Sequence, residues 1–349
     1  GGCIERLSKY DEATYYFHNL KFDGEFLLNH FFRNGYKYND NKKFLKKKEI
    51  NCLISDMGQF YSMDVCFENG NKIKIIDSLK ILPFSVHDIA EGFGLEEKKG
   101  SIDYNKYRPY GYELDIEEID YLRNDVVIVA KALFTLFNQG LQKMTQGANA
   151  LADYKKIIGS KKFKKLFPIL PYDDFCRKSY KGGYTYVKKG MENKEIGYGK
   201  VFDVNSLYPY VMYEKLLPYG EGVSYTGKYK EDKLYPLYIQ EIKCSFELKD
   251  NHLPTIQIKN ARSFFKPNQY LESSGGKVVT MVMTSVDLKL FFEHYNVEDI
   301  TYVQGYKFKG AIGLFKDYID KWIKVKIESS INGNKSMRTL AKLMLNALY

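Results

Sequence analysis

The chain has 349 residues, of which 44% are hydrophobic and 28% charged, and it carries a formal net charge of +10 at pH 7. This length and composition indicate a soluble globular protein of two or three domains and exclude a disordered, fibrous or disulfide-stapled chain. No apolar run approaches the roughly 20 residues that span a bilayer, and the N-terminus lacks a secretory pattern, so we expect a cytoplasmic location and no membrane contact.

The first predicted elements are a strand, a turn and a helix. Residues 14–19 (TYYFHN) are rich in strand-forming side chains, and residues 24–32 show helical apolar spacing. Gly35 follows as a suitable C-terminal cap. Further strands are predicted within residues 51–67 and over residues 72–77.

Asp23 is the first candidate functional residue, because it lies where the strand gives way to the helix. Such a position directs a carboxylate into a cleft. The residues around it supply hydrogen-bond donors and rings, namely His18, Asn19, Phe22 and Phe26. Asp23 is therefore a candidate metal ligand flanked by base-stacking groups, although an acidic residue at a turn more often caps a helix.

A long helix is predicted from residue 115 to about residue 140. Asp115 and Glu118 have capping-box spacing. The expected apolar face consists of Ile119, Leu122, Val126, Val129 and Leu133. The basic, glycine-containing residues 139–165 that follow are typical of a domain junction.

The segment YLRNDVV of this helix pairs a phenol with a carboxylate. Tyr121 and Asp125 are four residues apart, so they lie on one helix face. Two-metal phosphodiester hydrolysis uses such a pair, with the carboxylate on a metal and the phenol orienting the attacking water. A solvated helix face is the alternative.

The segment FDVNSLYPYVM raises the question of what holds a carboxylate among apolar neighbours. We expect a turn at Gly182 and Gly183, a strand over residues 200–204 that ends at Asp203, and a short helix that carries Tyr208. In this arrangement Asp203 is buried and needs a cation or a metal. The carbonyl of Val204 would add a metal ligand, and the ring of Tyr208 would form the floor of a pocket that binds a sugar.

The remaining elements are a β-rich region over residues 235–259, a strand, helix and strand over residues 277–308, and two helices over residues 314–349. On the last helix four polar side chains fall within one arc, namely Arg338, Lys342, Asn346 and Tyr349. The opposite side carries Met337, Leu340, Ala341, Met344 and Leu348. Cations one turn apart suit a triphosphate, and a solvated basic face is the alternative.

Strands mixed with helices predict an α/β plus α+β multidomain fold. The net charge, combined with 31 Tyr and 23 Phe, favours nucleic acid as partner, because lysines neutralise phosphates and aromatic rings stack on unpaired bases. A compositional bias inherited from an AT-rich genome would explain the same residue usage.

Five segments, in this order, resemble motifs of the family B DNA polymerases, and specifically of the protein-primed branch of phages and linear plasmids. HNLKFD resembles the second exonuclease motif, YLRND the third, YKGGY the linker motif, DVNSLYP polymerase motif A and AKLMLNALY motif B. The resemblance spans nearly the whole chain. It implies a ribonuclease-H-like exonuclease domain, part of a palm, an inserted β-containing subdomain and helical fingers.

The resemblance also implies roles for individual residues. In the exonuclease site, Asp23 and Asp125 would be metal ligands, and Tyr121 would orient water. Lys99 and Tyr104 would lie near the scissile phosphate. The single-strand ligands would be His18, Asn19, Phe22, Phe26, Ser78 and Leu79. Tyr180, Gly182 and Gly183 would guide the primer terminus between the sites. In the polymerase site, Asp203 and Val204 would bind metal, Tyr208 would exclude a ribose 2′-OH, and the nucleotide would be held by Lys326, Arg338, Lys342, Asn346 and Tyr349.

The domains expected from the resemblance are the exonuclease domain (residues 1–143), the linker and first part of the palm (144–214), the inserted subdomain (215–313) and the fingers (314–349). The implied cofactor is Mg²⁺, two ions per active site, with Mn²⁺ as an alternative. The implied partners are template-primer DNA, single-stranded DNA, dNTPs and a terminal priming protein.

Departures from the family pattern lead us to expect a fragment with little activity alone. The first exonuclease motif would lie before Gly1, and the third polymerase motif would lie beyond Tyr349. Arg338 and Ala347 stand where the family often has Lys and Ser. Two further hypotheses are a non-catalytic nucleic-acid-binding module derived from such a polymerase, and an unrelated basic α/β protein whose carboxylates are helix caps.

Overall fold

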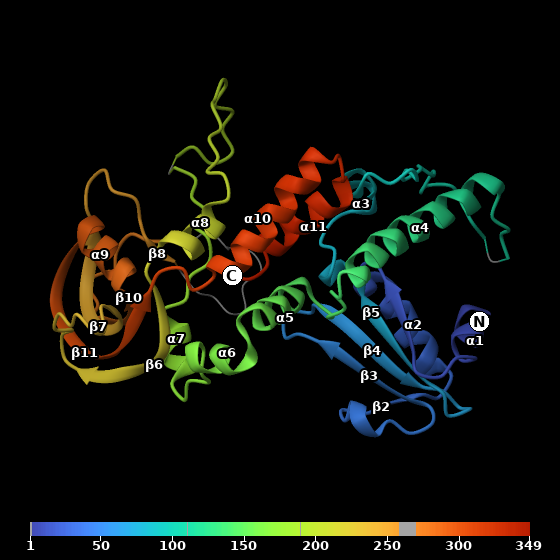
Figure 1. Ribbon diagram of the computed structural model, residues 1–349, viewed down its shortest axis with the longest axis horizontal. Coiled ribbons are helices and arrows are strands. Elements are labelled where there is room, and N and C mark those ends of the chain that lie inside the picture. The colour runs from blue at the N-terminus through green and yellow to red at the C-terminus, as the bar shows by residue number, and fades with distance from the viewer. Residues whose placement is uncertain (1, 110, 189, 258–269) are drawn as a thin grey trace. The chain divides into compact units, whose positions relative to one another are not determined.

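The computed structural model describes residues 2–109, 111–188, 190–257 and 270–349 (Figure 1). The chain forms two compact units. The first consists of Gly1–Ile157 with Asp317–Tyr349, and the second of Ile158–Lys316.

The first unit contains a five-stranded sheet in the order β1-β5-β4-β3-β2. Its strands are β1 (Ala13–Phe17), β2 (Lys37–Tyr38), β3 (Glu49–Ile54), β4 (Phe60–Cys66) and β5 (Lys72–Asp77). β1 runs parallel to β5, and the pairing of Phe17 with Asp77 brings the C-terminal ends of these two strands together. β4 runs antiparallel to both β5 and β3. This edge of the sheet positions the first candidate site.

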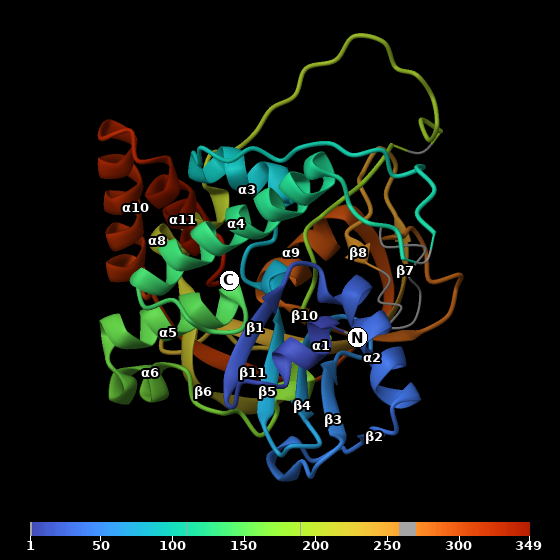
Figure 2. The same ribbon diagram turned by 90° about the vertical axis from the view of Figure 1, so that its right-hand side faces the viewer.

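The helices of the first unit are α1 (Gly2–Leu7), α2 (Leu20–Arg33), α3 (Val86–Phe93), α4 (Ile116–Asn138), α5 (Gln146–Ile158), α10 (Lys316–Ile331) and α11 (Lys335–Leu345), with 3₁₀ turns at Lys42–Phe44 and Ser78–Lys80. α2 packs on β4 and β5, and Leu20, Phe31 and Phe60 are buried between helix and sheet. α3, α4 and α11 pack against one another (Figure 2). Gly35 follows α2 with a φ of 78°, as its predicted capping position requires.

The predicted capping box of α4 is confirmed. Asp115 accepts a hydrogen bond from the backbone N–H of Glu118, and the Glu118 carboxylate accepts one from the backbone N–H of Asp115. Glu118 is buried and also accepts hydrogen bonds from Arg108 and Tyr112. The start of the helix is therefore held by a connected polar network.

Only two of the five residues predicted for the apolar face of α4 are buried. Val129 and Leu133 are buried, but Ile119, Leu122 and Val126 are 50%, 48% and 68% exposed. In its first half, α4 instead buries Glu118 and Tyr121. The helix therefore turns a polar side inward where the candidate site lies.

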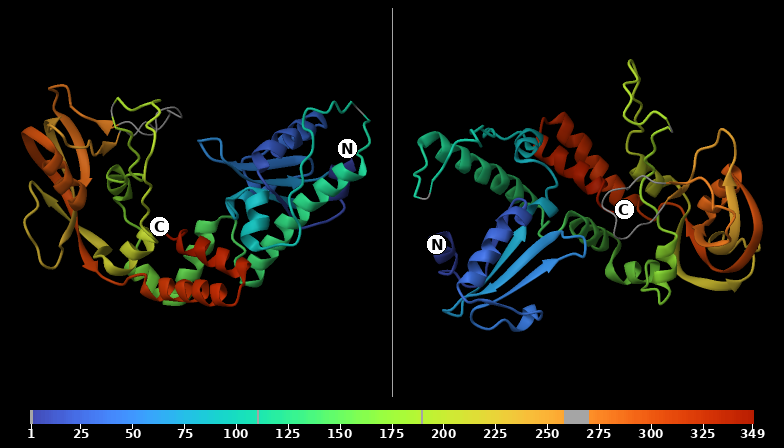
Figure 3. Two further views of the ribbon diagram at one scale, coloured as in Figure 1. Left: turned by 90° about the horizontal axis from the view of Figure 1, so that it is seen from above. Right: turned by 180° about the vertical axis from the view of Figure 1, so that it is seen from behind.

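The second unit contains an antiparallel four-stranded sheet in the order β10-β7-β11-β6. Its strands are β6 (Leu217–Thr226), β7 (Leu237–Leu248), β10 (Val279–Thr284) and β11 (Tyr295–Ala311), and β8 (Ile256–Gln257) pairs separately with β9 (Tyr270–Leu271). The long strand β11 curves with its neighbours (Figure 3), and its register shifts against β7 and β6 accommodate that curvature.

The helices of the second unit are α6 (Ser160–Leu166), α7 (Asp173–Lys178), α8 (Leu207–Glu214) and α9 (Ser285–His294). α9 covers the sheet through Leu288 and Phe291, which join a core with Phe246 and Tyr295. The β-rich region, as far as Gln257, and the strand, helix and strand that follow it are where the sequence predicted them, while residues 258 and 259 of that prediction lie outside the described residues.

Three local predictions in the second unit are wrong. Residues 200–204 form no strand, because a strand needs a hydrogen-bonded neighbour and none of the described strands pairs with this segment. The segment is exposed, and so is Asp203, which the sequence had placed among buried neighbours. Gly182 and Gly183 lie in irregular backbone without a turn, and neither adopts a positive φ.

The two helices predicted over residues 314–349 are confirmed as α10 and α11. Asn334 caps α11 by accepting a hydrogen bond from the backbone N–H of Met337. In the described part of the chain, no helix combines the length and apolarity needed to cross a membrane.

Candidate functional sites

In the first unit, Asp23 and Asp125 face one cavity of about 850 Å³. Asp23 lies in the first turn of α2, and Asp125 lies near the middle of α4. The remaining walls come from β1, α3 and α4 and are largely apolar: Tyr16, Phe17, His18, Val86, Leu122, Val126, Val129, Ala130, Leu133, Phe134 and Phe137. The structure thus brings together two carboxylates that are about a hundred positions apart in the sequence.

Asp23 is half-buried at this cavity. Burial raises the pKa of its carboxyl group, and the negative charge of Asp77 adds to that rise, against the lowering effect of a backbone hydrogen bond. A carboxylate in this environment is stabilised in its ionised form by a nearby cation.

Asp125 has one oxygen without a partner. Its Oδ1 is buried and accepts no hydrogen bond from any described residue, whereas its Oδ2 lies 3.9 Å from the Nζ of Lys99. A buried carboxylate oxygen is costly to leave unpaired. The donor set therefore fits a hard divalent cation, which binds carboxylate oxygens. Within the described ranges, no three His, Cys, Asp or Glu side chains gather into a metal-binding group.

Tyr121 lies one turn before Asp125 and is buried. Burial raises the pKa of its phenol well above the usual range, with smaller contributions from its hydrogen bond to Tyr104 and from the charge of Asp125. The two phenol oxygens of Tyr104 and Tyr121 are 2.6 Å apart. Tyr121 therefore stays protonated at neutral pH and is suited to orienting a water molecule by hydrogen bonding. Lys99 lies above its ring, with Nζ 6.0 Å from the ring centre.

The predicted single-strand ligands gather where β1 and β5 end. The Nε2 of His18 donates to the carbonyl of Phe84 over 2.8 Å, and its Nδ1 lies 3.0 Å from Ser78 Oγ. Ser78 in turn donates to the carbonyl of Phe17. Phe22 and Phe26 project from α2, each 65% exposed, with ring centres 5.5 Å apart. They present two rings to solvent from the helix that carries Asp23.

Asp77 organises this region, and the sequence reasoning missed it. Its side chain is almost fully buried, and its Oδ1 accepts the backbone N–H groups of Asn19 and Leu79, each over 3.0 Å. Asn19 adopts a left-handed conformation with a φ of 71°. Asp77 thus fixes two of the predicted ligand positions. The signal available in the sequence was an acidic residue at a strand end followed by Ser.

In the second unit, Asp203 and Val204 lie in exposed irregular backbone just before α8. Ser206 has a φ of 54° and sharply reverses the chain into that helix. Tyr208, in the first turn of α8, is 49% exposed. A Cβ added to Gly183 would lie 3.7 Å from the Tyr208 hydroxyl, so the linker motif passes directly beside this ring.

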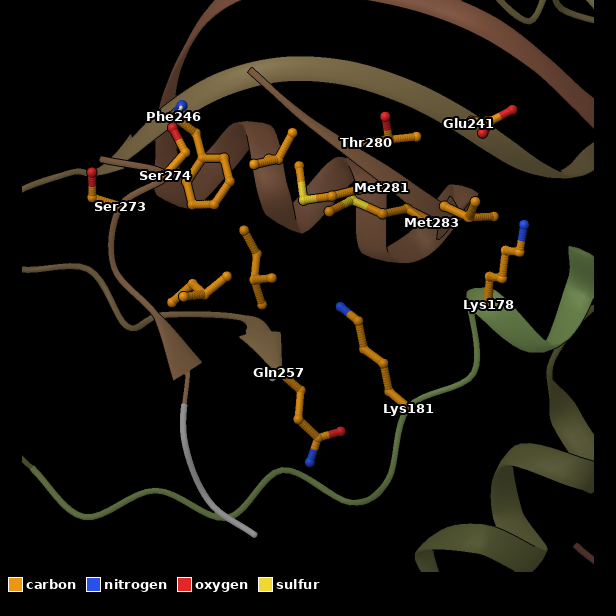
Figure 4. A pocket seen from close by; sticks show the side chains of 14 residues that line it. Lys178, Lys181, Glu241, Phe246, Gln257, Ser273, Ser274, Thr280, Met281 and Met283 are labelled. Carbon is orange, nitrogen blue, oxygen red and sulfur yellow. Dashed lines mark hydrogen bonds between the residues drawn. The ribbon is translucent and has the colours of Figure 1, made fainter. Parts of the chain in front are cut away.

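The linker motif also contacts the β-rich part of the second unit. Lys181 Nζ donates to the carbonyl of Thr255 and to Asp287 Oδ1, each over 3.2 Å, and Gly182 N–H donates to Gln257. Lys181 points into a cavity of about 660 Å³ that is lined on the facing side by β10 side chains such as Met281 and Met283 (Figure 4). Tyr180, just before this contact, is 74% exposed.

The predicted polar arc is present in part, because only Arg338 and Lys342 lie within α11. Arg338, Lys342, Asn346 and Tyr349 are exposed, while Leu340, Ala341, Leu343, Met344 and Leu345 are buried. No described residue forms an ion pair with Arg338 or Lys342. Asn346 caps the helix, so Tyr349 lies beyond its end. Lys326, on α10, is half-buried.

The helix pair α10 and α11 is fixed by contacts that the sequence did not predict. Asp153 on α5 accepts hydrogen bonds from Lys321 Nζ (2.7 and 2.8 Å) and from Trp322 Nε1 (2.9 Å). Tyr318 donates to the carbonyl of Met344 over 2.7 Å, which links the two helices. Thr339 donates to the carbonyl of Gly92 on α3. Hydrogen bonds to α5 and α3 and between α10 and α11 therefore fix the two helices that carry the candidate nucleotide-binding residues.

Comparisons with known proteins identify the family of the chain. The family model for DNA polymerase type B, organellar and viral, matches residues 4–110 and 101–349. The DNA polymerase of Bacillus phage phi29 is 49% identical over 344 residues, which cover 97% of this chain and 58% of that protein. The DNA polymerase of Streptococcus phage Cp-1 is 36% identical and is covered to the same extent. The chain thus spans about 58% of the length of these curated relatives.

Solved structures give the same similarity. Phi29 DNA polymerase in an orthorhombic crystal form superposes with a TM-score of 0.91 at 47% identity, over 100% of this chain and 61% of that one. Its complex with single-stranded DNA gives a TM-score of 0.90 at 45% identity, over 100% of this chain and 60% of that one. The predicted mixed α/β multidomain fold is thereby confirmed.

If Asp23 and Asp125 together hold a divalent cation, the ion will stabilise the first unit. Mn²⁺ at about five times its dissociation constant should add roughly 1 kcal/mol, or about 2 °C in the unfolding midpoint. Thermal unfolding of wild type and Asp125→Asn, with and without Mn²⁺, measures this effect. Because the pKa of Asp23 is raised, its protonation should abolish the stabilisation by Mn²⁺ at a higher pH than protonation of an aspartate with an ordinary pKa would. An equal Mn²⁺ effect in Asp125→Asn contradicts the assignment.

Replacing Asp153 tests the support of α10 and α11. Asp153→Ala leaves Lys321 and Trp322 without their acceptor and should lower the free energy of unfolding by about 1–3 kcal/mol. Urea denaturation can be followed by the fluorescence of Trp322, the only Trp in the sequence. The matched control is Glu328→Ala, which removes an exposed carboxylate 3.9 Å from Lys324 on the same helix and should cost less than about 0.5 kcal/mol. Similar losses in both variants would refute the bracing role.

Proposed function

The chain belongs to the organellar and viral type B DNA polymerases, and from this membership we propose that it forms the exonuclease and nucleotide-binding portion of a template-directed, protein-primed DNA polymerase with 3′–5′ proofreading. The observation that carries the nuclease part is the pair Asp23 and Asp125 in one cavity, with a buried oxygen of Asp125 left unpaired. The proposed substrates are template-primer DNA, single-stranded DNA and dNTPs.

In the nuclease site, Asp23 and Asp125 would hold Mg²⁺ or Mn²⁺. The bound ion supplies a Lewis acid that stabilises charge on the phosphodiester. Tyr121, protonated and held by Tyr104, orients the attacking water through its hydroxyl. Lys99, beside Asp125, offers positive charge to the scissile phosphate.

The single-strand ligands position the DNA terminus. Phe22 and Phe26 stack on unpaired bases, which contributes roughly 1–3 kcal/mol per base. His18, Asn19, Ser78 and Leu79 line the same sheet edge and would bind the sugar and phosphate groups. Their positions follow from the pairing of Phe17 with Asp77.

By the family pattern, Asp203 and the carbonyl of Val204 would bind Mg²⁺ for nucleotide addition. Arg338, Lys342 and Lys326 would neutralise the triphosphate, because positioning and charge stabilisation dominate phosphoryl transfer. Asn346 and Tyr349 would line the nascent base pair, and Tyr208 would exclude a ribose 2′-OH. The passage of Gly183 beside the Tyr208 hydroxyl supports a role for Tyr180, Gly182 and Gly183 in guiding the primer terminus.

The domain assignment follows the same family pattern. Residues 1–143 would form the exonuclease domain, residues 144–214 the linker and first part of the palm, residues 215–313 the inserted subdomain and residues 314–349 the fingers. A terminal protein with a priming hydroxyl would dock on the inserted subdomain. The host cytoplasm is the proposed location.

Two substitutions should separate the two activities in the full-length polymerase. Asp203→Asn should lower nucleotide addition by about 10³-fold, since a lost metal ligand removes several kcal/mol of charge stabilisation, and it should leave exonuclease activity intact. Asp125→Asn should have the opposite effect. Primer-extension and single-strand degradation assays on the same preparations measure both rates. Equal loss of both activities in either variant contradicts the two-site account.

Tyr208→Val should relax sugar selection. Removing the ring opens space for a 2′-hydroxyl, so the preference for dNTP over NTP should fall by roughly 10-fold or more, the scale on which a pocket rejects one extra group. Steady-state incorporation of both sugars measures the ratio. Tyr210→Val is the matched control, because Tyr210 lies on the same helix and is 52% exposed. Unchanged selection in Tyr208→Val would show that its ring has no role in selecting the sugar.

A further inference from the structure

The segment from Lys155 to Tyr172 is strongly basic and contains no acidic residue. Its sequence is KKIIGSKKFKKLFPILPY, and the nearest acidic residues in the chain are Asp153 and Asp173. Four of its lysines lie on α6: Lys161, Lys162, Lys164 and Lys165. None of the residues assigned to the nuclease or nucleotide sites belongs to this segment.

α6 packs within the second unit through an aromatic ring on one side of the helix. The ring of Phe163 lies 5.3 Å from that of Phe167, which stacks on Phe315 at 5.8 Å. At 100° per residue, Phe163 points away from the arc that holds the four lysines. The anchored helix therefore turns a purely cationic face outward.

This cationic face has no counter-charge within the described part of the protein. All four lysines are exposed, and none of them forms an ion pair. Like charges three and four residues apart destabilise a helix. A solvated face tolerates that repulsion, whereas a polyanion bound along the helix would relieve it.

We propose that the lysine face of α6 binds the phosphate backbone of DNA outside the two active sites. The proposal deepens the polymerase function and rests on it. Lys161 and Lys165 are separated by one helical turn, about 6 Å along the axis, and each DNA strand carries a phosphate every 3.4 Å. Neighbouring lysines can therefore contact successive phosphates.

The composition of the face favours DNA over an acidic protein. The cores of protein interfaces are depleted in Lys and enriched in aromatic residues. On α6 the large apolar side chains are Phe163 and Leu166, both only partly exposed, and Phe163 is engaged in the aromatic anchor. The outward arc offers charge without an apolar anchor, which matches sequence-independent phosphate binding.

The test is the salt dependence of DNA binding by the 349-residue chain. Binding of a fluorescent primer-template duplex is measured by anisotropy from about 50 to 200 mM KCl for wild type and for the combined variant Lys161→Ala, Lys162→Ala, Lys164→Ala and Lys165→Ala. The slope of log affinity against log salt should fall in magnitude by about 2–4, because each phosphate contact contributes about 0.9. Affinity at the lowest salt should weaken about 10-fold or more.

The matched control removes the same charge elsewhere. Lys42, Lys43, Lys46 and Lys47 are exposed on the first unit, and their combined replacement by Ala should change the slope by less than one. Equal changes in both variants indicate a general charge effect and overturn the proposal. The single Trp322 in the first unit and circular dichroism check that each variant is folded.

The remaining outcomes separate this proposal from the function on which it rests. If wild type binds the duplex and the α6 variant binds it with the same slope, only the α6 proposal fails. If the α6 variant loses binding to polyglutamate but not to DNA, the face serves an acidic polypeptide and the proposal is again overturned. If wild type does not bind DNA at all, the proposed polymerase function fails as well.

Discussion

The register of α4 is the constraint on which the candidate nuclease site depends. Glu118 is buried at the start of the helix, where Arg108, Tyr112 and the Asp115 backbone all donate to it. Residues three and seven positions further along share its side of the helix. Tyr121 is therefore buried and Asp125 faces the cavity, so that a polar anchor at the helix start determines which groups reach the site one and two turns later.

The cavity combines apolar walls with two carboxylates, and this combination is costly unless a cation is part of the site. The raised pKa of Asp23 and the unpaired oxygen of Asp125 are two signs of the same desolvation. A structure evolved for stability alone would pair these groups or replace them. The presence of these carboxylates together with exposed Phe22 and Phe26 on α2 connects the energetics of the fold to nucleic acid chemistry.

Local signals in the sequence were sufficient for α4, for the helices α10 and α11 and for the exposed Arg338 and Lys342 on α11, because capping and helical periodicity act within a few residues. These signals failed where residues distant in the sequence determine strand pairing or burial. Residues 200–204 have strand composition but no pairing partner among the described strands, and Leu122 and Val126 have core composition but line the cavity. Asp77 and Asp153 were missed because their roles exist only after folding brings Asn19 and Trp322 to them.

The central claim is that Asp23 and Asp125 jointly bind a divalent cation through the oxygen that the protein leaves unpaired. A crystal structure of the chain soaked in Mn²⁺, with anomalous diffraction recorded at the manganese edge, tests this claim most directly. The account predicts an anomalous peak in the cavity within about 2.0–2.3 Å of Asp125 Oδ1 and near Asp23, a distance typical of small divalent cations bound to oxygen. An empty cavity at saturating Mn²⁺, with Asp125 Oδ1 hydrogen-bonded to a protein donor, would contradict it.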